Sequence, residues 1–274
     1  MFDINEITEF CENYEICDAH AHIFPEKISQ KAVLSIGDFY SLPMSCKNGI
    51  SNELIKCGKT IGVTHYLVCS TATVPHQVES INNFIINECK LHPEFVGFGT
   101  LHPDYENIDE EVDRIINSGL RGVKIHPDFQ EFYIDEDKAL KIYKAVEGKL
   151  PILIHMGDPR YDYSRPKRLE SVMKAFPKLD VFAAHLGGYE RWSEAITCLF
   201  GKNIYFDTSS SLEFLSTDYA KDIIRGFGAD KIFFGTDFPM WNHFDEIQRF
   251  MKLGLNDDEN KKILNDNFKK YFKL

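Results

Sequence analysis

The sequence lacks any uninterrupted apolar run long enough to cross a bilayer, so we expect no membrane-spanning helix and no membrane partner. It has no basic N-terminal region followed by an apolar stretch, and we therefore expect no signal peptide. Basic residues are fewer than acidic ones, and the formal net charge is −11. Because nucleic-acid binding requires a positive surface that neutralises phosphates, this balance argues against a nucleic-acid partner.

No two cysteines have the Cys-x-x-Cys spacing, and the seven cysteines are scattered and odd in number. A chain of 274 residues can bury a core without disulfides, so this distribution is typical of reduced thiols in a cytoplasmic protein. Low-complexity segments, linkers and charge blocks that would mark a domain boundary are also missing. We therefore expect a single domain over residues 1–274 and a cytoplasmic location.

What the sequence does contain is an alternation of short apolar, β-rich runs with longer segments of helical spacing. The helical segments include Val78–Leu91, Ile108–Ser118 and Asp137–Glu147. Several such segments end at a glycine (Gly62, Gly119 or Gly148), as helix C-caps often do. The expected strands are Ile16–Ile23, Thr64–Ser70, Phe95–Leu101, Gly122–His126, Ile152–His155, Val181–His185, Ile204–Thr208 and Ile232–Thr236.

Eight strands that alternate with helices imply parallel strands joined by right-handed crossovers. The candidate architectures are a closed eight-stranded barrel and an open doubly wound sheet. A sheet that binds a dinucleotide would carry Gly-x-Gly-x-x-Gly after its first strand, but here that strand ends in Asp-Ala-His-Ala-His at residues 18–22. The length is also close to the ~250 residues of a one-domain barrel. We therefore predict an α/β fold of the (β/α)8 TIM-barrel class.

Two further segments have a predicted place in this barrel. Asn256–Leu274 is expected to be a closing amphipathic helix, capped by Asn256 or Asp257. The connection from Ile23 to Ile50 is long, and a long loop after a barrel strand is often a lid or a substrate wall.

Histidine and aspartate side chains recur at the ends of the expected strands. His20 and His22 are two apart on one strand, so both imidazoles point to the same face, about 7 Å apart along the chain. His155, His185 and Asp237 end or directly follow other strands, at the barrel face where active sites are built. One buried histidine would be expected only to hydrogen-bond to a neighbouring carbonyl, but five such groups on one rim favour a zinc-like divalent ion.

The Asp-Ala-His-Ala-His run, the two single histidines and the Gly-Thr-Asp-Phe-Pro run at 235–239 resemble the amidohydrolase-2 branch of the amidohydrolase superfamily over essentially the whole chain. That branch includes aminocarboxymuconate-semialdehyde decarboxylase, related decarboxylases and several lactonases. The resemblance implies metal ligation by His20, His22, His155 and Asp237, with His185 as a catalytic acid/base or an additional ligand. It implies one ion, for which we expect Zn²⁺, and a homodimer as one form of assembly.

Lys124 and His126 share a face of the fourth expected strand. Binuclear members of the superfamily bridge two metals with a carboxylated lysine on this strand, so Lys124 is a candidate for that role, with two ions. We favour the alternative, a lysine that lines the pocket and binds an anionic substrate, because the branch that the chain resembles is usually mononuclear. His126 and His102 are candidates to contact substrate or to cap their strands, and Asp18 is a candidate to orient an imidazole.

The predicted function is metal-dependent hydrolysis of an amide, ester or lactone bond in a small substrate, by a metal-activated water. Asp237 would ligate the metal and accept the water proton, and His185 would assist at the carbonyl or the water. Non-oxidative decarboxylation is the alternative, since the same groups support both reactions. Arg160 is a candidate to clamp a substrate carboxylate, unless it pairs with Asp158 or Asp162. A nuclease of the TatD type would have a glutamate on the fourth strand, which this chain lacks.

Overall fold

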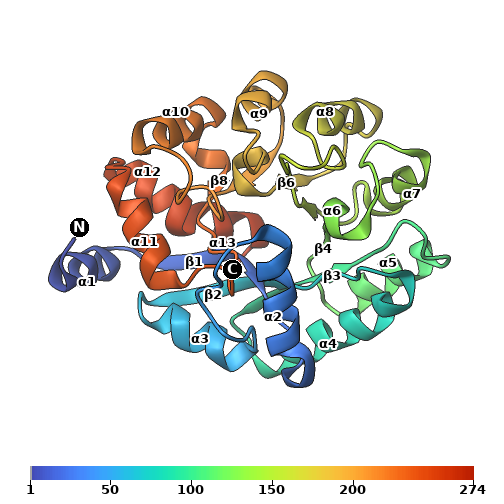
Figure 1. Ribbon diagram of the computed structural model, residues 1–274, viewed down its shortest axis with the longest axis horizontal. Coiled ribbons are helices and arrows are strands. Elements are labelled where there is room, and N and C mark those ends of the chain that lie inside the picture. Colours follow the sequence, from blue (N-terminus) through green and yellow to red (C-terminus); the bar gives the residue numbers. More distant parts are fainter. Residues whose placement is uncertain (1) are drawn as a thin grey trace. The chain divides into compact units, whose positions relative to one another are not determined.

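The computed structural model describes residues 2–274 and shows strands that alternate with helices along the chain (Figure 1). The eight strands follow one another in the sheet in their chain order, β1 to β8. They are β1 (Ile16–His22), β2 (Val63–Cys69), β3 (Phe95–Thr100), β4 (Gly122–Ile125), β5 (Ile152–Ile154), β6 (Val181–Ala183), β7 (Tyr205–Asp207) and β8 (Ile232–Phe233). This strand order with alternating helices is the topology of the (β/α)8 class that the sequence predicts.

The helices cover most of the sequence between the strands, and within the described residues none is both long and apolar enough to cross a membrane. They are α1 (Ile4–Asn13), α2 (Glu26–Tyr40), α3 (Ser51–Lys59), α4 (Val78–Leu91), α5 (Ile108–Asn117), α6 (Pro127–Gln130), α7 (Asp137–Val146), α8 (Pro166–Ala175), α9 (Trp192–Leu199), α10 (Thr217–Phe227), α11 (His243–Lys252), α12 (Asp257–Lys261) and α13 (Asn267–Phe272).

Every expected strand is present and begins within one residue of its predicted start, but each ends one to three residues earlier than predicted. The apolar pattern therefore continues past the point where the backbone ladder stops. As a result His126, His155, His185 and Asp237 lie in the loops that directly follow their strands. These loops can turn each side chain in a direction that a continuing strand would not allow.

The chain divides into two compact units, and each is described by itself. The first unit comprises the described residues up to Val68 together with Thr208–Leu274, drawn in blue and in orange to red in Figure 1. The second unit is Cys69–Asp207.

Within the first unit, backbone hydrogen bonds join β1 to the segment that follows β8. Ala21 forms a parallel bridge with Phe238, just beyond β8. The Ala19 N–H donates to the Phe234 carbonyl at 2.8 Å, and the His22 N–H donates to the Phe238 carbonyl at 2.7 Å. The first strand is thereby fixed in register against the segment that carries Asp237.

The predicted closing helix is correct in its start but is not one regular α-helix. Asn256 caps it in a capping box with Glu259, with both hydrogen bonds at 2.9 Å. Between α12 and α13, Lys262–Asp266 forms a π-helical turn. The Ile263 carbonyl accepts a hydrogen bond from the Phe234 N–H at 2.9 Å, which draws this carbonyl away from the regular helical ladder.

The predicted long loop between Ile23 and Ile50 contains a helix, α2, so the expectation of a loop there is wrong for residues 26–40. The helix was not evident from hydrophobic spacing because its buried face consists of Ser29, Val33 and Gly37, while Leu34 is 67 % exposed. Only the residues after Tyr40 form an irregular connection to α3.

In the second unit the parallel strands β3 to β7 pair in a register that places Gly122 opposite Phe98. Both residues are buried, and a Cβ atom added at Gly122 would overlap the Phe98 ring. The glycine is therefore required by close packing between adjacent strands and not by its backbone angles.

We predict that Gly122→Ala destabilises the protein by roughly 1–3 kcal/mol, because the added methyl group must displace a buried ring. Urea denaturation followed by far-UV circular dichroism measures the change. The double variant Gly122→Ala with Phe98→Leu is the matched control. Its loss in free energy of unfolding should be smaller than the sum of the losses in the two single variants. A single variant as stable as the parent chain would contradict this packing argument.

Candidate metal centre

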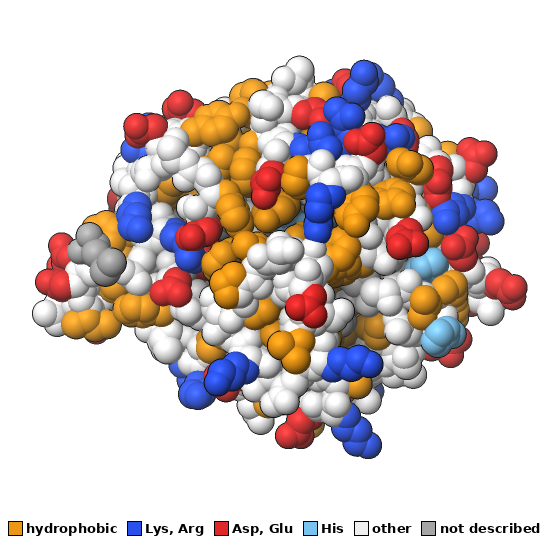
Figure 2. All heavy atoms as spheres, in the orientation of Figure 1, with side chains coloured by type: hydrophobic (Ala, Val, Ile, Leu, Met, Phe, Trp, Pro, Cys, Tyr) orange, Lys and Arg blue, Asp and Glu red, His pale blue; other side chains and the backbone are white. Residues whose placement is uncertain are grey.

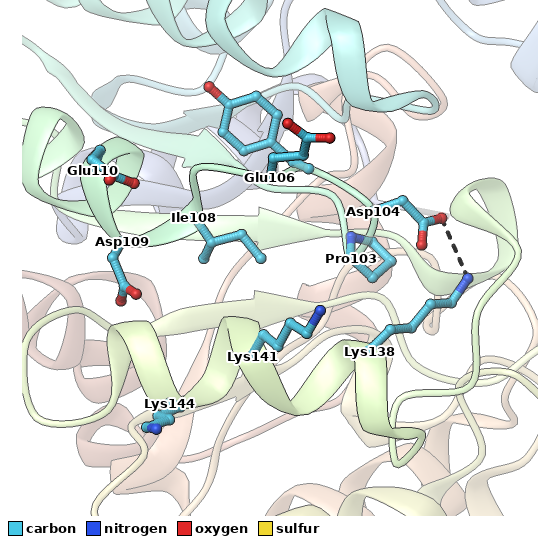
Figure 3. A pocket seen from close by; sticks show the side chains of 10 residues that line it. Pro103, Asp104, Glu106, Ile108, Asp109, Glu110, Lys138, Lys141 and Lys144 are labelled. Atoms are coloured by element: carbon cyan, nitrogen blue, oxygen red, sulfur yellow. Dashed lines mark hydrogen bonds and ion pairs between the residues drawn. The ribbon is translucent and has the colours of Figure 1, made fainter.

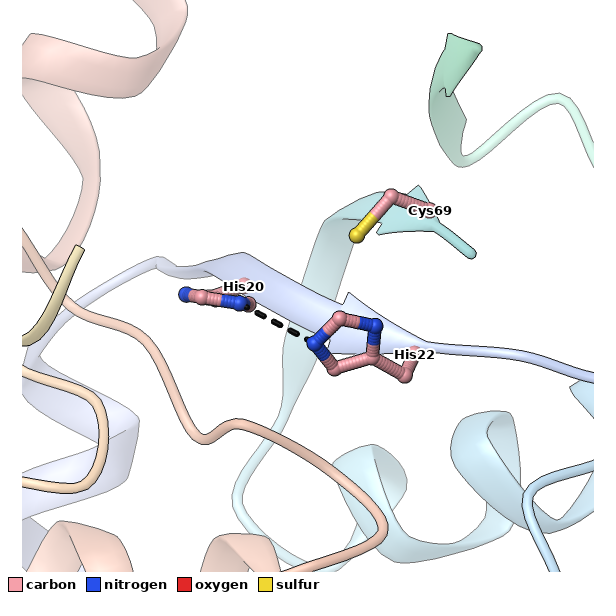
Figure 4. Close-up of side chains that lie close together, drawn as sticks. All are labelled: His20, His22 and Cys69. Atoms are coloured by element: carbon pink, nitrogen blue, oxygen red, sulfur yellow. Dashed lines mark hydrogen bonds between the residues drawn. The ribbon is translucent and has the colours of Figure 1, made fainter. Parts of the chain in front are cut away.

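His20 and His22 direct their imidazole rings toward each other from β1, with 3.2 Å between the two Nε2 atoms (Figure 4). Asp237 Oδ1 lies 3.6 Å from His20 Nε2 and 3.3 Å from His22 Nε2. His20 is fully buried, and the side chains of His22 and Asp237 are 14 % and 13 % exposed. The three predicted ligands of the first unit thus present their ligand atoms as a compact triangle that remains accessible from one side.

This triangle fits a small divalent ion. Metal–nitrogen distances of about 2.0–2.1 Å around a tetrahedral ion separate neighbouring ligand atoms by roughly 3.3–3.4 Å. The three observed separations lie on both sides of this value. Two imidazoles and one carboxylate oxygen are also a donor set that zinc and related divalent ions accept.

Serine hydroxyls hold two of these ligands from the segment that follows β7. Ser209 Oγ lies 3.0 Å from His20 Nδ1, the ring nitrogen on the far side from His22. Ser210 Oγ donates to Asp237 Oδ2 at 2.6 Å and in turn accepts a hydrogen bond from Trp241 Nε1 at 3.0 Å. Such contacts fix the direction of a ligand's lone pair, so both serines are positioning residues that the sequence analysis did not identify.

The backbone at the site is held in the left-handed region, which residues other than glycine seldom adopt. Asp237 has φ +58° and Ser210 has φ +46° in the first unit, and His185 has φ +60° in the second. The Asp237 N–H donates to the His20 carbonyl at 2.8 Å, which secures that turn. Conformations of this kind cluster at functional sites.

Asp18 binds the backbone of the site as well as an imidazole. Its Oδ1 accepts from the backbone N–H groups of His20 and Thr236, at 3.0 and 3.1 Å, and its Oδ2 accepts from the Thr236 hydroxyl at 2.6 Å. The imidazole that it faces is that of His243, whose Nε2 lies 2.9 Å from Asp18 Oδ2. Asp18 therefore holds the backbone of the site and not the ring of a predicted ligand.

His243 begins α11 and is fully buried, although its position just after the last strand gave no sign of a role in the sequence. Burial lowers the pKa of this imidazole, but the nearby Asp18 carboxylate and Cys57 thiol outweigh burial, so that the pKa is raised. The ring thus lies between two groups that can be negative.

In the second unit, the predicted ligand His155 and the predicted acid/base His185 form a pair. His155 Nδ1 lies 2.9 Å from His185 Nε2, and both rings are buried. The backbone of His185 is held on both sides, since its N–H donates to Asp207 Oδ1 at 3.1 Å and its carbonyl accepts from Trp192 Nε1 at 3.0 Å. The pair can share one proton between fixed nitrogen atoms.

His126 and Asp128 lie on the other side of His155. The rings of His126 and His155 are stacked, with centroids 3.8 Å apart, and the Asp128 Oδ2 atom is 3.8 Å from His155 Nε2. Burial raises the pKa of Asp128 to about 7. Its Oδ2 accepts from the Ser164 hydroxyl at 2.6 Å, while its Oδ1 is buried without a hydrogen-bond partner. Ligand atoms of His126, Asp128 and His155 lie within 4.8 Å of one another.

The remaining candidates of the fourth and fifth strands have definite positions. His126 caps α6, because its Nδ1 accepts from the Phe129 N–H at 3.3 Å. Lys124 is fully buried on β4. The Arg160 guanidinium donates to the buried Asp158 carboxylate at 2.9 and 2.6 Å, so the ion pair named as the alternative to a substrate clamp is present.

A separate groove on the second unit is lined by residues that follow β3 and by α5 and α7 (Figure 3). Its charged residues have both signs, and Lys138 pairs with Asp104 at 3.4 Å. No predicted site residue lines it. On the face in Figure 2, acidic and basic side chains are interspersed among hydrophobic ones.

Solved structures confirm the fold. A 5-carboxyvanillate decarboxylase from Sphingomonas paucimobilis is 15 % identical, with 95 % of this chain and 99 % of that chain covered and a TM-score of 0.73. A dihydroxybenzoic acid decarboxylase from Polaromonas sp. JS666, with bound manganese and 2-nitroresorcinol, is 18 % identical, with 95 % and 97 % covered and a TM-score of 0.73. A probable 2-pyrone-4,6-dicarboxylic acid hydrolase from Acinetobacter baumannii, with bound citric acid, is 18 % identical, with 95 % and 100 % covered and a TM-score of 0.70.

The amidohydrolase family model matches residues 17–274, from the second residue of β1 to the C-terminal residue. The match therefore includes the histidine pair, both single histidines and Asp237, in agreement with the resemblance drawn from their motifs. This chain belongs to the amidohydrolase family, in its amidohydrolase-2 branch.

Proposed function

We propose that this protein is a metal-dependent, non-oxidative decarboxylase that acts on a small conjugated carboxylic acid. The observation that carries the proposal is the triangle of ligand atoms from His20, His22 and Asp237. His155 is the fourth ligand in the proposal, as predicted from the sequence. A divalent ion bound there would polarise an oxygen atom of the substrate.

The chain's own residues would orient the ligands and handle the proton. Ser209 and Ser210 hold His20 and Asp237 in the directions that the triangle requires. Decarboxylation breaks the bond between a substrate carbon and its carboxylate, releases carbon dioxide and places a proton on the same carbon. His185 is the proposed proton donor, because its ring is fixed against His155 and its backbone is held rigidly.

We propose decarboxylation as the first candidate reaction, in place of the hydrolysis expected from the sequence. Decarboxylases of hydroxylated aromatic acids are prominent among the similar structures, and several of them hold manganese. Hydrolysis of a lactone stays the second candidate, since probable 2-pyrone-4,6-dicarboxylic acid hydrolases are also similar. Manganese joins zinc as a candidate ion for the same reason.

The reaction is tested by product analysis on the metal-loaded protein. We expect release of labelled carbon dioxide from at least one member of a panel of carboxyl-¹³C-labelled hydroxybenzoates, measured by membrane-inlet mass spectrometry. A His185→Asn variant should lose this activity by about 10²-fold or more, as expected for removal of a proton donor. Opening of a pyrone lactone without carbon dioxide release would reject decarboxylation in favour of hydrolysis.

Metal binding is tested separately from turnover. We predict about one ion per chain by inductively coupled plasma mass spectrometry after loading with Zn²⁺ or Mn²⁺ in bicarbonate buffer. His22→Ala should lower the metal affinity by more than about 100-fold. Removing a residue that only hydrogen-bonds to a ligand usually lowers it by about 10–100-fold, and removing a ligand itself should cost more. His76→Ala, at a histidine outside the site, is the matched control. Two ions per chain would instead indicate a carboxylated Lys124.

Ser210→Ala tests the support of Asp237. Removing the hydroxyl at 2.6 Å should weaken metal binding by roughly 10–100-fold while the fold is retained, because the carboxylate loses its fixed direction. Competition with a chelating dye measures the affinity, and circular dichroism checks the fold. Ser211→Ala, which removes a hydroxyl that donates to the Ser209 carbonyl, should bind metal like the parent chain. Equal affinities for the two variants would rule out this role of Ser210.

A further inference from the structure

Two cysteines of the first unit lie side by side behind the segment that carries Asp237. Cys57 is in the last turn of α3, and Cys46 is in the connection between α2 and α3. Their Sγ atoms are 3.9 Å apart, which is van der Waals contact. All seven cysteines are free thiols, and these two face each other.

The surroundings distinguish the two thiols. Cys46 is 8 % exposed, whereas Cys57 is partly exposed and lies against the imidazole of His243. Contact with Cys46 and His243 lowers the pKa of Cys57, against the effects of burial and of the Glu53 carboxylate, whose Oε1 lies 3.9 Å from Cys57 Sγ. The same pairing, together with burial, raises the pKa of Cys46. A partly exposed thiol with a lowered pKa beside a buried thiol is the arrangement of a reactive cysteine and its resolving partner.

The backbone around Cys46 connects this pair to the metal centre. The Cys46 N–H donates to the Pro239 carbonyl at 3.2 Å, and the Ser45 N–H donates to the Met240 carbonyl at 2.9 Å. His243, on the side of Cys57, contacts Asp18, which holds the backbone of His20. Cys46 is therefore bonded through its backbone to the loop that carries Asp237, and Cys57 is linked through His243 to Asp18.

We propose that Cys46 and Cys57 form a peroxide-sensitive dithiol that closes into an intramolecular disulfide beside the metal centre. The Cys57 thiolate attacks a hydroperoxide oxygen, the O–O bond breaks, and the leaving hydroxide or alkoxide takes a proton. The product is a sulfenic acid at Cys57. Cys46 sulfur then attacks the Cys57 sulfur, forms the S–S bond and releases water, with the Cys46 proton taken up by the departing hydroxide. One hydroperoxide thus oxidises two thiols.

The test uses the reduced, full-length chain and hydrogen peroxide as the oxidant. Unreacted thiols are blocked before trypsin cleaves after Lys31, Lys47, Lys56 and Lys59, so the two cysteines fall on separate peptides, 32–47 and 57–59. We expect a disulfide-linked pair of these peptides and a decrease from seven free thiols to five, both reversed by dithiothreitol. Cys57 should react at least about tenfold faster than Cys198, another partly exposed cysteine whose pKa is raised mainly by burial.

Variants separate the two roles. In Cys46→Ser, peroxide should leave a sulfenic acid at Cys57 that dimedone traps, and in Cys57→Ser no linked peptide should form while Cys46 stays reduced. Cys198→Ser is the matched control and should form the disulfide like the parent chain. The proposal is overturned if the linked peptide is absent from oxidised native protein, or if Cys57 reacts no faster than Cys198.

Discussion

The backbone pairing between β1 and the segment after β8 is the constraint on which the metal centre depends. The bridge between Ala21 and Phe238 sets the register, and the hydrogen bond from the Asp237 N–H to the His20 carbonyl places the carboxylate beside the histidine pair. A shift of one residue on β1 would turn His20 and His22 to the opposite face. The triangle of ligand atoms therefore depends first on strand register, and side-chain conformation can complete it only in the correct register.

The support of this triangle comes from polar groups that bind backbone as often as side chains. Asp18 joins the backbone of β1 to Thr236, and Ser210 joins Asp237 to Trp241. These groups are buried, so each unmade hydrogen bond would carry the cost of desolvation. Because these groups hydrogen-bond to one another, Asp237 and Ser210 can keep backbone angles that are unfavourable by themselves.

The sequence was sufficient to predict the strands and their order, and alternation along a strand determines which side chains share a face. His20 and His22 follow from that rule alone. The supporting residues could not be found in this way. Ser209, Ser210 and His243 lie in a loop and at a helix start, and their roles depend on contacts between segments far apart in sequence. Helix α2 was missed because small residues form its buried face.

The shared hydrogen bonds between the Cys46 segment and the loop after Asp237 have a thermodynamic consequence. Coupling between two sites is reciprocal: whatever factor the thiol state imposes on metal affinity, metal occupancy imposes on the equilibrium between dithiol and disulfide. The reduction potential of this cysteine pair is then a reporter of metal occupancy. In a cell, the same two sulfur atoms would register both the supply of the metal and the level of peroxide.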